Sequence, residues 1–118
     1  MQISKRVINK NIQNEIYNIF YQVIVDLENS NQAKEILEGL FGKTEIITAA
    51  KRLAIAHYLE KGRSYQNIKD NLKVSSATIS TVDKQRKTKG FQLALKKIET
   101  ESWASEWSSK IESLFKKK

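Results

Sequence analysis

Five residues with short hydroxyl side chains stand close together in the middle of the chain, within the stretch SSATIST. Hydroxyl groups both donate and accept hydrogen bonds, and they are short enough to contact base edges and phosphates in a DNA groove. Ile79 and Val82 lie three residues apart in this region, which predicts a helix with one buried face. The opposite face then carries the hydroxyls and two cations: Ser75, Ser76, Thr78, Ser80, Thr81, Lys84 and Arg86.

A second short helix is predicted just before this stretch, because Ile68 and Leu72 are four residues apart and share one face. Burial between the two helices would fix their crossing through five apolar residues: Ile68, Leu72, Val74, Ile79 and Val82. Residues 64–87 are therefore predicted to form a helix-turn-helix whose second helix can enter a DNA major groove. The alternative is an ordinary helical hairpin whose hydroxyl face is only solvated.

The positive charge of the chain is concentrated on the same region. Residues 61–97 contain ten Lys or Arg and two acids, whereas residues 1–60 and 98–118 each sum to zero. The whole net charge of +8 therefore lies on the segment with the helix-turn-helix pattern, as expected of a protein that binds a polyanion. The residues predicted to neutralise phosphates, with a solvated loop as the alternative, are Lys84, Arg86, Lys87 and Lys89.

Size and composition favour one all-α domain over residues 1–118, since 40% of the residues are apolar and none is proline. No apolar run reaches the length of a membrane span, the start of the chain lacks the apolar stretch of a signal peptide, and cysteine is absent. With a single histidine, His57, and no glycine-rich phosphate loop, we expect neither an enzyme nor a bound metal or cofactor. His57 is expected to be partly buried.

The other predicted helical regions are residues 4–28, 31–40, 44–62 and 91–115. Gly42 is expected to end the second of these, Thr44 to cap the third and Gly62 to end it. Ser64 is expected to cap the first helix of the helix-turn-helix, and Ser75 or Ser76 the second. In the last region Trp103 and Trp107 are predicted to anchor the core or a dimer rather than to stack on bases.

The first predicted helix has a broad apolar stripe for so short a chain. Two chains that pair through residues 1–40 would cover this stripe and place two reading helices on one side of the dimer. Such a dimer suits a two-fold related DNA site with half-sites about one helical turn apart. The alternative is a monomer whose first helix folds over the rest of the chain.

Residues 41–84 resemble the Trp repressor superfamily through the segments KRLAIA, SYQNI and VSSATIS, over little more than a third of the chain. The resemblance implies an all-α, intertwined homodimer that inserts its helix-turn-helix into operator DNA, in the bacterial cytoplasm and on the nucleoid. By position it implies base and nearby phosphate contacts by Ser76, Ala77, Thr78 and Ser80. It also implies phosphate contacts by Lys69 and Lys87.

The resemblance does not extend to the family's tryptophan site, where two arginines hold the indole and one arginine and a threonine hold the carboxylate. Arg52 stands at the first arginine position, but Thr81 stands at the second and Gly42 at the threonine position. The missing cation removes a charge-assisted hydrogen bond of roughly 1.5–3 kcal/mol. We therefore expect that tryptophan is not the effector. Arg52 is expected to pair with a carboxylate, to bind phosphate, or to line a vestigial effector cleft.

A dimeric transcriptional regulator, acting as a repressor on double-stranded DNA, is the leading hypothesis. The alternative is a basic architectural or adaptor protein that binds DNA or RNA without sequence preference. This alternative stays open because the first two turns of the predicted reading helix lack Asn, Gln and Arg, the side chains that form bidentate base contacts. A third hypothesis is the DNA-docking module of replication or transposition machinery, which would normally be joined to a catalytic domain.

Overall fold

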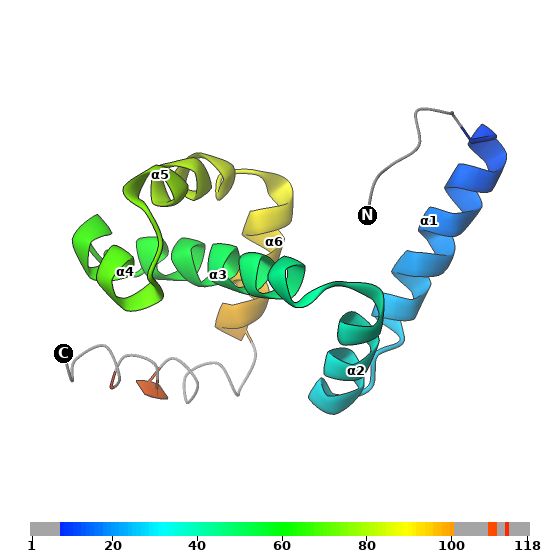
Figure 1. The fold of residues 1–118 in the computed structure, drawn as a ribbon, viewed down its shortest axis with the longest axis horizontal. Coiled ribbons are helices and arrows are strands. Elements are labelled where there is room, and N and C mark those ends of the chain that lie inside the picture. The colour runs from blue at the N-terminus through cyan, green and yellow to red at the C-terminus, as the bar shows by residue number, and fades with distance from the viewer. Residues whose placement is uncertain (1–7, 101–108, 111–112, 114–118) are drawn as a thin grey trace. The chain divides into compact units, whose positions relative to one another are not determined.

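The computed structural model describes residues 8–100, 109–110 and 113, and in this part of the chain all regular structure is helical (Figure 1). The predicted all-α class is therefore confirmed. The contacts divide the chain into two compact units, Met1–Lys43 and Thr44–Lys118. The helices are α1 Lys10–Val25, α2 Ser30–Leu40, α3 Lys43–Glu60, α4 Tyr65–Leu72, α5 Ser76–Gln85 and α6 Lys89–Thr100.

Helices α1 and α2 belong to the first unit, and asparagine side chains cap their N-termini. Asn9 accepts hydrogen bonds from the amides of Asn11 and Ile12, and Asn29 accepts one from the amide of Gln32 at 2.8 Å. No residue of either helix is buried in the single chain. α1 and α2 therefore bury none of their apolar residues fully within the single chain.

The cap roles predicted for Gly42 and Thr44 are wrong, although the second helix ends at residue 40 as predicted. α2 ends at Leu40, followed by Phe41 in an extended conformation, and Gly42 does not adopt the left-handed backbone of a glycine stop. α3 begins at Lys43, so Thr44 lies inside its first turn. The chain therefore leaves α2 through an extended residue instead of a left-handed glycine.

Gly62 ends α3 as predicted, with a φ of +80° that residues with a Cβ rarely adopt. The Gly62 amide donates to the Leu59 carbonyl, and the Arg63 amide donates to the Tyr58 carbonyl, both at 3.0 Å. These bonds satisfy carbonyls that the end of the helix would otherwise leave open. The turn sends the chain directly into the first helix of the helix-turn-helix.

The hydrophobic core of the second unit is built by α3, α4, α5 and α6. Its buried members are Ile55, Ala56, Tyr58, Ile68, Ile79, Val82 and Leu95, against which Leu59, Leu72, Val74 and Phe91 pack. All five apolar residues predicted to fix the helix crossing therefore belong to one core. His57 is more buried than expected, with 4% of its surface exposed.

Two serine caps and one left-handed residue set the turn of the helix-turn-helix. Ser64 accepts a hydrogen bond from the Asn67 amide and Ser75 accepts one from the Thr78 amide, both at 3.1 Å, so α4 and α5 begin as predicted. α4 ends at Lys73, whose φ of 55° is in the left-handed region. A left-handed conformation costs a residue with a Cβ about 1–2 kcal/mol, and glycine avoids that cost.

The predicted C-terminal helical region starts two residues earlier than expected, because α6 begins at Lys89. The described part of α6 ends at Thr100, and Trp103 and Trp107 lie outside the described residues. Among the described helices, none combines the length and the apolar character needed to cross a membrane.

Candidate nucleic-acid interface

The hydroxyl face of α5 points to solvent because its apolar residues are turned into the core. Ile79 and Val82 are buried, while Ser80 between them is half-buried. The exposed residues of the predicted reading face are Ser75, Ser76, Ala77, Thr78, Thr81 and Lys84. In Figure 1 α5 lies at the periphery of the second unit. This part of the predicted site is therefore brought together on one accessible surface.

Three of these hydroxyl groups form hydrogen bonds within α5 or at its N-terminus. The Ser75 oxygen caps α5 and also lies 2.9 Å from the Thr78 hydroxyl. The Thr81 hydroxyl donates to the Ala77 carbonyl at 3.0 Å. A hydroxyl oxygen that has used its donor keeps acceptor capacity, so these groups still present lone pairs at the surface.

Three lysines predicted to contact phosphate are exposed on the helix-turn-helix or just after it. Lys69 is exposed on α4, Lys84 is exposed on the last turn of α5, and Lys87 is exposed in the turn that follows. Each carries a flexible stem with a compact point charge, which suits phosphate contacts of variable geometry. The helix-turn-helix therefore exposes both short hydroxyls and lysines.

Arg86 is arranged differently from the neighbouring lysines. Its Nη1 lies 2.7 Å from Glu60 Oε1 and its Nε lies 2.7 Å from Asp83 Oδ1, and 25% of its side chain is exposed. The hydrogen bond from Arg86 is the main reason why the pKa of Asp83 is lowered, and the same bond raises the pKa of Arg86. Two carboxylates thus face this guanidinium, and the phosphate contact predicted for Arg86 stays a prediction.

Asp83 also accepts a hydrogen bond from Tyr65, the first residue of α4. The Tyr65 hydroxyl donates to Asp83 Oδ2 at 2.8 Å, and this bond is the largest cause of the raised pKa of Tyr65. One carboxylate thus receives hydrogen bonds from Tyr65 at the start of α4 and from Arg86 just after α5. The two helices of the helix-turn-helix are joined by this polar contact as well as by their apolar residues.

Arg52, predicted to pair with a carboxylate or phosphate or to line an effector cleft, has other neighbours. Its Nη2 donates to Gln85 Oε1 at 2.7 Å, and its guanidinium carbon lies 5.3 Å from the ring centroid of Phe91. Arg52 on α3 therefore contacts both the last residue of α5 and the first turn of α6. Sequence reasoning did not place Glu60, Tyr65 or Phe91 at this site.

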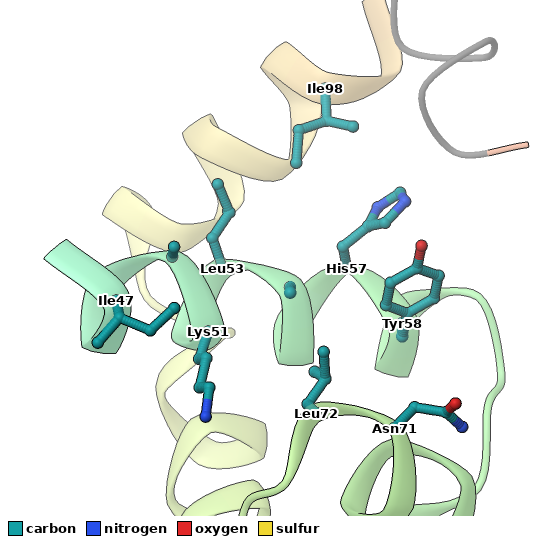
Figure 2. Close-up of a pocket in the computed structure, with 10 residues that line it drawn as sticks. Ile47, Lys51, Leu53, His57, Tyr58, Asn71, Leu72 and Ile98 are labelled. Carbon is teal, nitrogen blue, oxygen red and sulfur yellow. The ribbon is translucent and has the colours of Figure 1, made fainter. Parts of the chain in front are cut away.

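An apolar pocket of about 410 Å³ lies within the second unit, apart from the reading face (Figure 2). It is lined by Ile47, Ala50, Lys51, Leu53, Ala54, His57, Tyr58, Asn71, Leu72 and Ile98. None of the residues predicted to contact DNA belongs to this lining. Its apolar character suits packing against another apolar surface, whereas the reading face is polar and basic.

The fold and this face define an all-α protein with an exposed helix-turn-helix. The family described as Trp repressor protein matches residues 15–99, so the chain belongs to this family. The crystal structure of a TrpR-like protein from Eubacterium eligens ATCC 27750 has the same fold, with a TM-score of 0.68 and 22% sequence identity. That similarity covers 78% of this chain and 97% of the other chain. No match is found among curated proteins.

The family assignment confirms the resemblance drawn from residues 41–84 and extends it beyond that stretch. The matched residues reach from within α1 to the last turn of α6. The family is one of DNA-binding regulators with a helix-turn-helix and without enzymatic activity.

Proposed function

We propose that the chain is a dimeric, sequence-specific transcriptional regulator that represses by occupying double-stranded DNA. The orientation of α5 carries the proposal, because Ile79 and Val82 hold it on the core while its hydroxyl face is exposed. A second helix of a helix-turn-helix presented in this way fits a major groove. We place the protein in the bacterial cytoplasm, on the nucleoid, as expected for this function.

The proposed contacts fall into two groups. Base edges and adjacent phosphates are contacted by Ser76, Ala77, Thr78, Ser80 and Thr81. The Ala77 methyl group suits an apolar contact with a thymine methyl, and the hydroxyls of Ser76, Thr78 and Ser80 suit donors or acceptors on any base. The Thr81 hydroxyl, which donates to the Ala77 carbonyl, is left as an acceptor. Phosphates are contacted by Lys69, Ser75, Lys84 and Lys87, which position the helix without reading sequence.

The proposed dimer is supported by the apolar face of α1. Ile12, Ile16 and Ile19 are 55%, 49% and 64% exposed in the single chain, and their spacing places them on one helix face. Apolar patches of this kind mark protein interfaces. We propose that residues 1–40 of two chains pair to cover it, which presents two reading helices to one duplex.

A non-specific architectural or adaptor protein is the second candidate. It is favoured by the lack of Asn, Gln and Arg in the first two turns of α5 and by the local hydrogen bonds of Ser75, Thr78 and Thr81. Both features reduce direct base readout. Such a protein would bind duplexes of all sequences through its lysines.

Selection of bound duplexes from a random-sequence DNA pool at about 150 mM salt separates the two candidates. Enrichment of an inverted repeat, with a specific-to-nonspecific affinity ratio above about 10³, supports the dimeric regulator. Binding without enrichment supports the architectural protein. A chain that binds no duplex refutes the dimeric regulator.

We also propose that free tryptophan is not the effector. Thr81 stands where the family has the second cation, and the Arg52 guanidinium already contacts Gln85 and Phe91. Calorimetric titration with L-tryptophan should show no binding in the micromolar range. Saturable micromolar binding would contradict this part of the proposal.

A further inference from the structure

The last turn of α5 is tied to α3 and α4 by side chains that are close in space but distant in sequence. Three residues at this end of α5 each form a hydrogen bond of 2.7–2.8 Å to α3 or α4. The pairs are Gln85 with Arg52, Asp83 with Tyr65, and Arg86 with Glu60. We call these residues the α5 clamp: Arg52, Glu60, Tyr65, Asp83, Gln85 and Arg86.

The two contacts with α3 are well separated along that helix. Arg52 and Glu60 are eight residues apart, which is about 12 Å at a rise of 1.5 Å per residue. Arg52 bonds Gln85, and Glu60 pairs with Arg86. The C-terminal end of α5 is therefore held at two separated points of α3.

The contact with α4 adds a third constraint. Tyr65 bonds Asp83, which also bonds Arg86, so the carboxylate is held from both sides. In contrast, α5 buries only Ile79 and Val82 in the core. Apolar contacts are not directional, so these two residues turn one face of α5 to the core but leave small changes in its rotation and tilt open. Hydrogen bonds weaken steeply when misaligned, so the clamp limits these changes.

We propose that Arg52, Tyr65, Asp83 and Arg86 are positioning residues that set the sequence preference of α5 without contacting base edges. The inference rests on the proposed DNA-binding function and adds to it the residues that orient the reading helix. It assigns Arg86 to this internal network in place of the phosphate contact that its charge alone suggests. A helix that contacts bases only through short hydroxyl side chains must be placed accurately. Such side chains are too short to reach the bases if the helix is displaced.

The clamp contributes more to orientation than to stability. The paired side chains are 25%, 32% and 37% exposed for Arg86, Asp83 and Glu60, and ion pairs that reach solvent contribute little to folding. The buried core of the second unit does not include these charged groups. Single clamp variants are therefore expected to fold, and their effect on DNA preference can be measured.

The test compares Asp83→Asn with Asp70→Asn and adds the uncharged variant Tyr65→Phe. Asp70 lies in the same helix-turn-helix and accepts a hydrogen bond from Gln66 within α4, so it joins no two helices. Both aspartate variants remove one negative charge. A difference between them therefore cannot come from the net charge of the protein. The readouts are the specific-to-nonspecific affinity ratio on the selected duplex, the salt slope of binding, and the thermal unfolding midpoint.

We expect Asp83→Asn and Tyr65→Phe to lower the ratio at least fivefold, while Asp70→Asn keeps it within twofold. The salt slope of Tyr65→Phe should stay that of the wild type, because no phosphate contact is lost. If Tyr65→Phe and Asp83→Asn fold and keep the wild-type ratio, the inference fails and the proposed function stands. A wild-type chain without sequence preference overturns the proposed function and this inference together.

Discussion

Helices α1 and α5 are both amphipathic, but of the two only α5 buries apolar residues within its own chain. Ile79 is fully buried, whereas Ile16 at the centre of α1 is 49% exposed. The second unit thus has a core within one chain, and the first unit has helices without one. Helix formation requires only local spacing and caps, but burial requires a partner surface, which α5 has in α3 and α4 and which we propose α1 finds in a second chain.

The largest effect is expected from removing a core residue of the second unit. Ile79→Ala should lower the free energy of unfolding by about 2–5 kcal/mol, because it leaves a cavity between α5 and the core. Leu93→Ala, which removes a residue 60% exposed on α6, should lower it by less than about 1 kcal/mol. Urea unfolding followed by circular dichroism measures both. Equal losses would mean that the core of the second unit is not where the structure places it.

A charge on the apolar face of α1 should act on assembly instead of folding. Ile16→Glu is expected to weaken dimer formation at least tenfold, because two glutamates would be buried together in the proposed interface. Asn18→Glu adds the same charge away from that face and should leave the dimer intact. Sedimentation equilibrium measures the association constants. An unchanged association constant for Ile16→Glu would place the dimer contact elsewhere or leave the chain monomeric.

Substitutions on the reading face should separate sequence preference from affinity. Thr78→Ala combined with Ser80→Ala is expected to relax the preference by roughly tenfold, since base-edge contacts are lost. Lys87→Ala should weaken binding to all duplexes alike and flatten the salt slope by about one unit. Fluorescence anisotropy on the selected and a scrambled duplex measures both. Identical behaviour of the two variants would show that the reading helix is misplaced.

A smaller effect is expected at the turn of the helix-turn-helix. Lys73→Gly should raise the free energy of unfolding by about 1 kcal/mol, because glycine adopts the left-handed conformation without the Cβ penalty. Lys69→Gly places the same residue inside α4 and should lower it by a similar amount. Thermal unfolding distinguishes the two signs. A loss of stability in Lys73→Gly would mean that the lysine side chain stabilises the turn.

The smallest effect is a pH dependence that arises from Asp83. Its pKa is lowered from the usual 3.8, chiefly by the hydrogen bond from Arg86 and then by that from Tyr65. A carboxyl whose pKa is lower in the folded state adds stability above its usual pKa and loses it as the pH falls through the folded value. The stability difference between the wild type and Asp83→Asn should therefore be constant near neutral pH and decline below about pH 4. Unfolding midpoints between pH 3 and pH 7 test this, and a difference that does not change with pH would contradict it.

The parts of the fold that rest on local patterns could be predicted from the sequence. The spacing of Ile68, Leu72, Ile79 and Val82 gave the helix-turn-helix, and Ser64 and Ser75 gave its caps, because both signals act within one or two turns. The stop expected at Gly42 was wrong, since a glycine permits a left-handed turn without requiring one.

The polar contacts around α5 could not be predicted, with one exception. Asp83 and Arg86 are three residues apart, a spacing that brings side chains together on a helix. The partner of Arg52 is Gln85, at a distance of thirty-three residues along the chain, and the pairing depends on how α5 crosses α3. Such a pairing follows from tertiary packing, and rules based on the spacing of residues along the chain cannot predict it.

The hydroxyl of Thr81 carries a consequence for the DNA sequence itself. Because its proton is donated to the Ala77 carbonyl, the oxygen faces outward as an acceptor. In the major groove, the groups that donate to an acceptor are the exocyclic amino groups of adenine and cytosine, while guanine and thymine offer acceptors there. If Thr81 contacts a base as proposed, a half-site is expected to place adenine or cytosine opposite it. Guanine or thymine would present an acceptor to the Thr81 oxygen, and the two acceptors would share no proton.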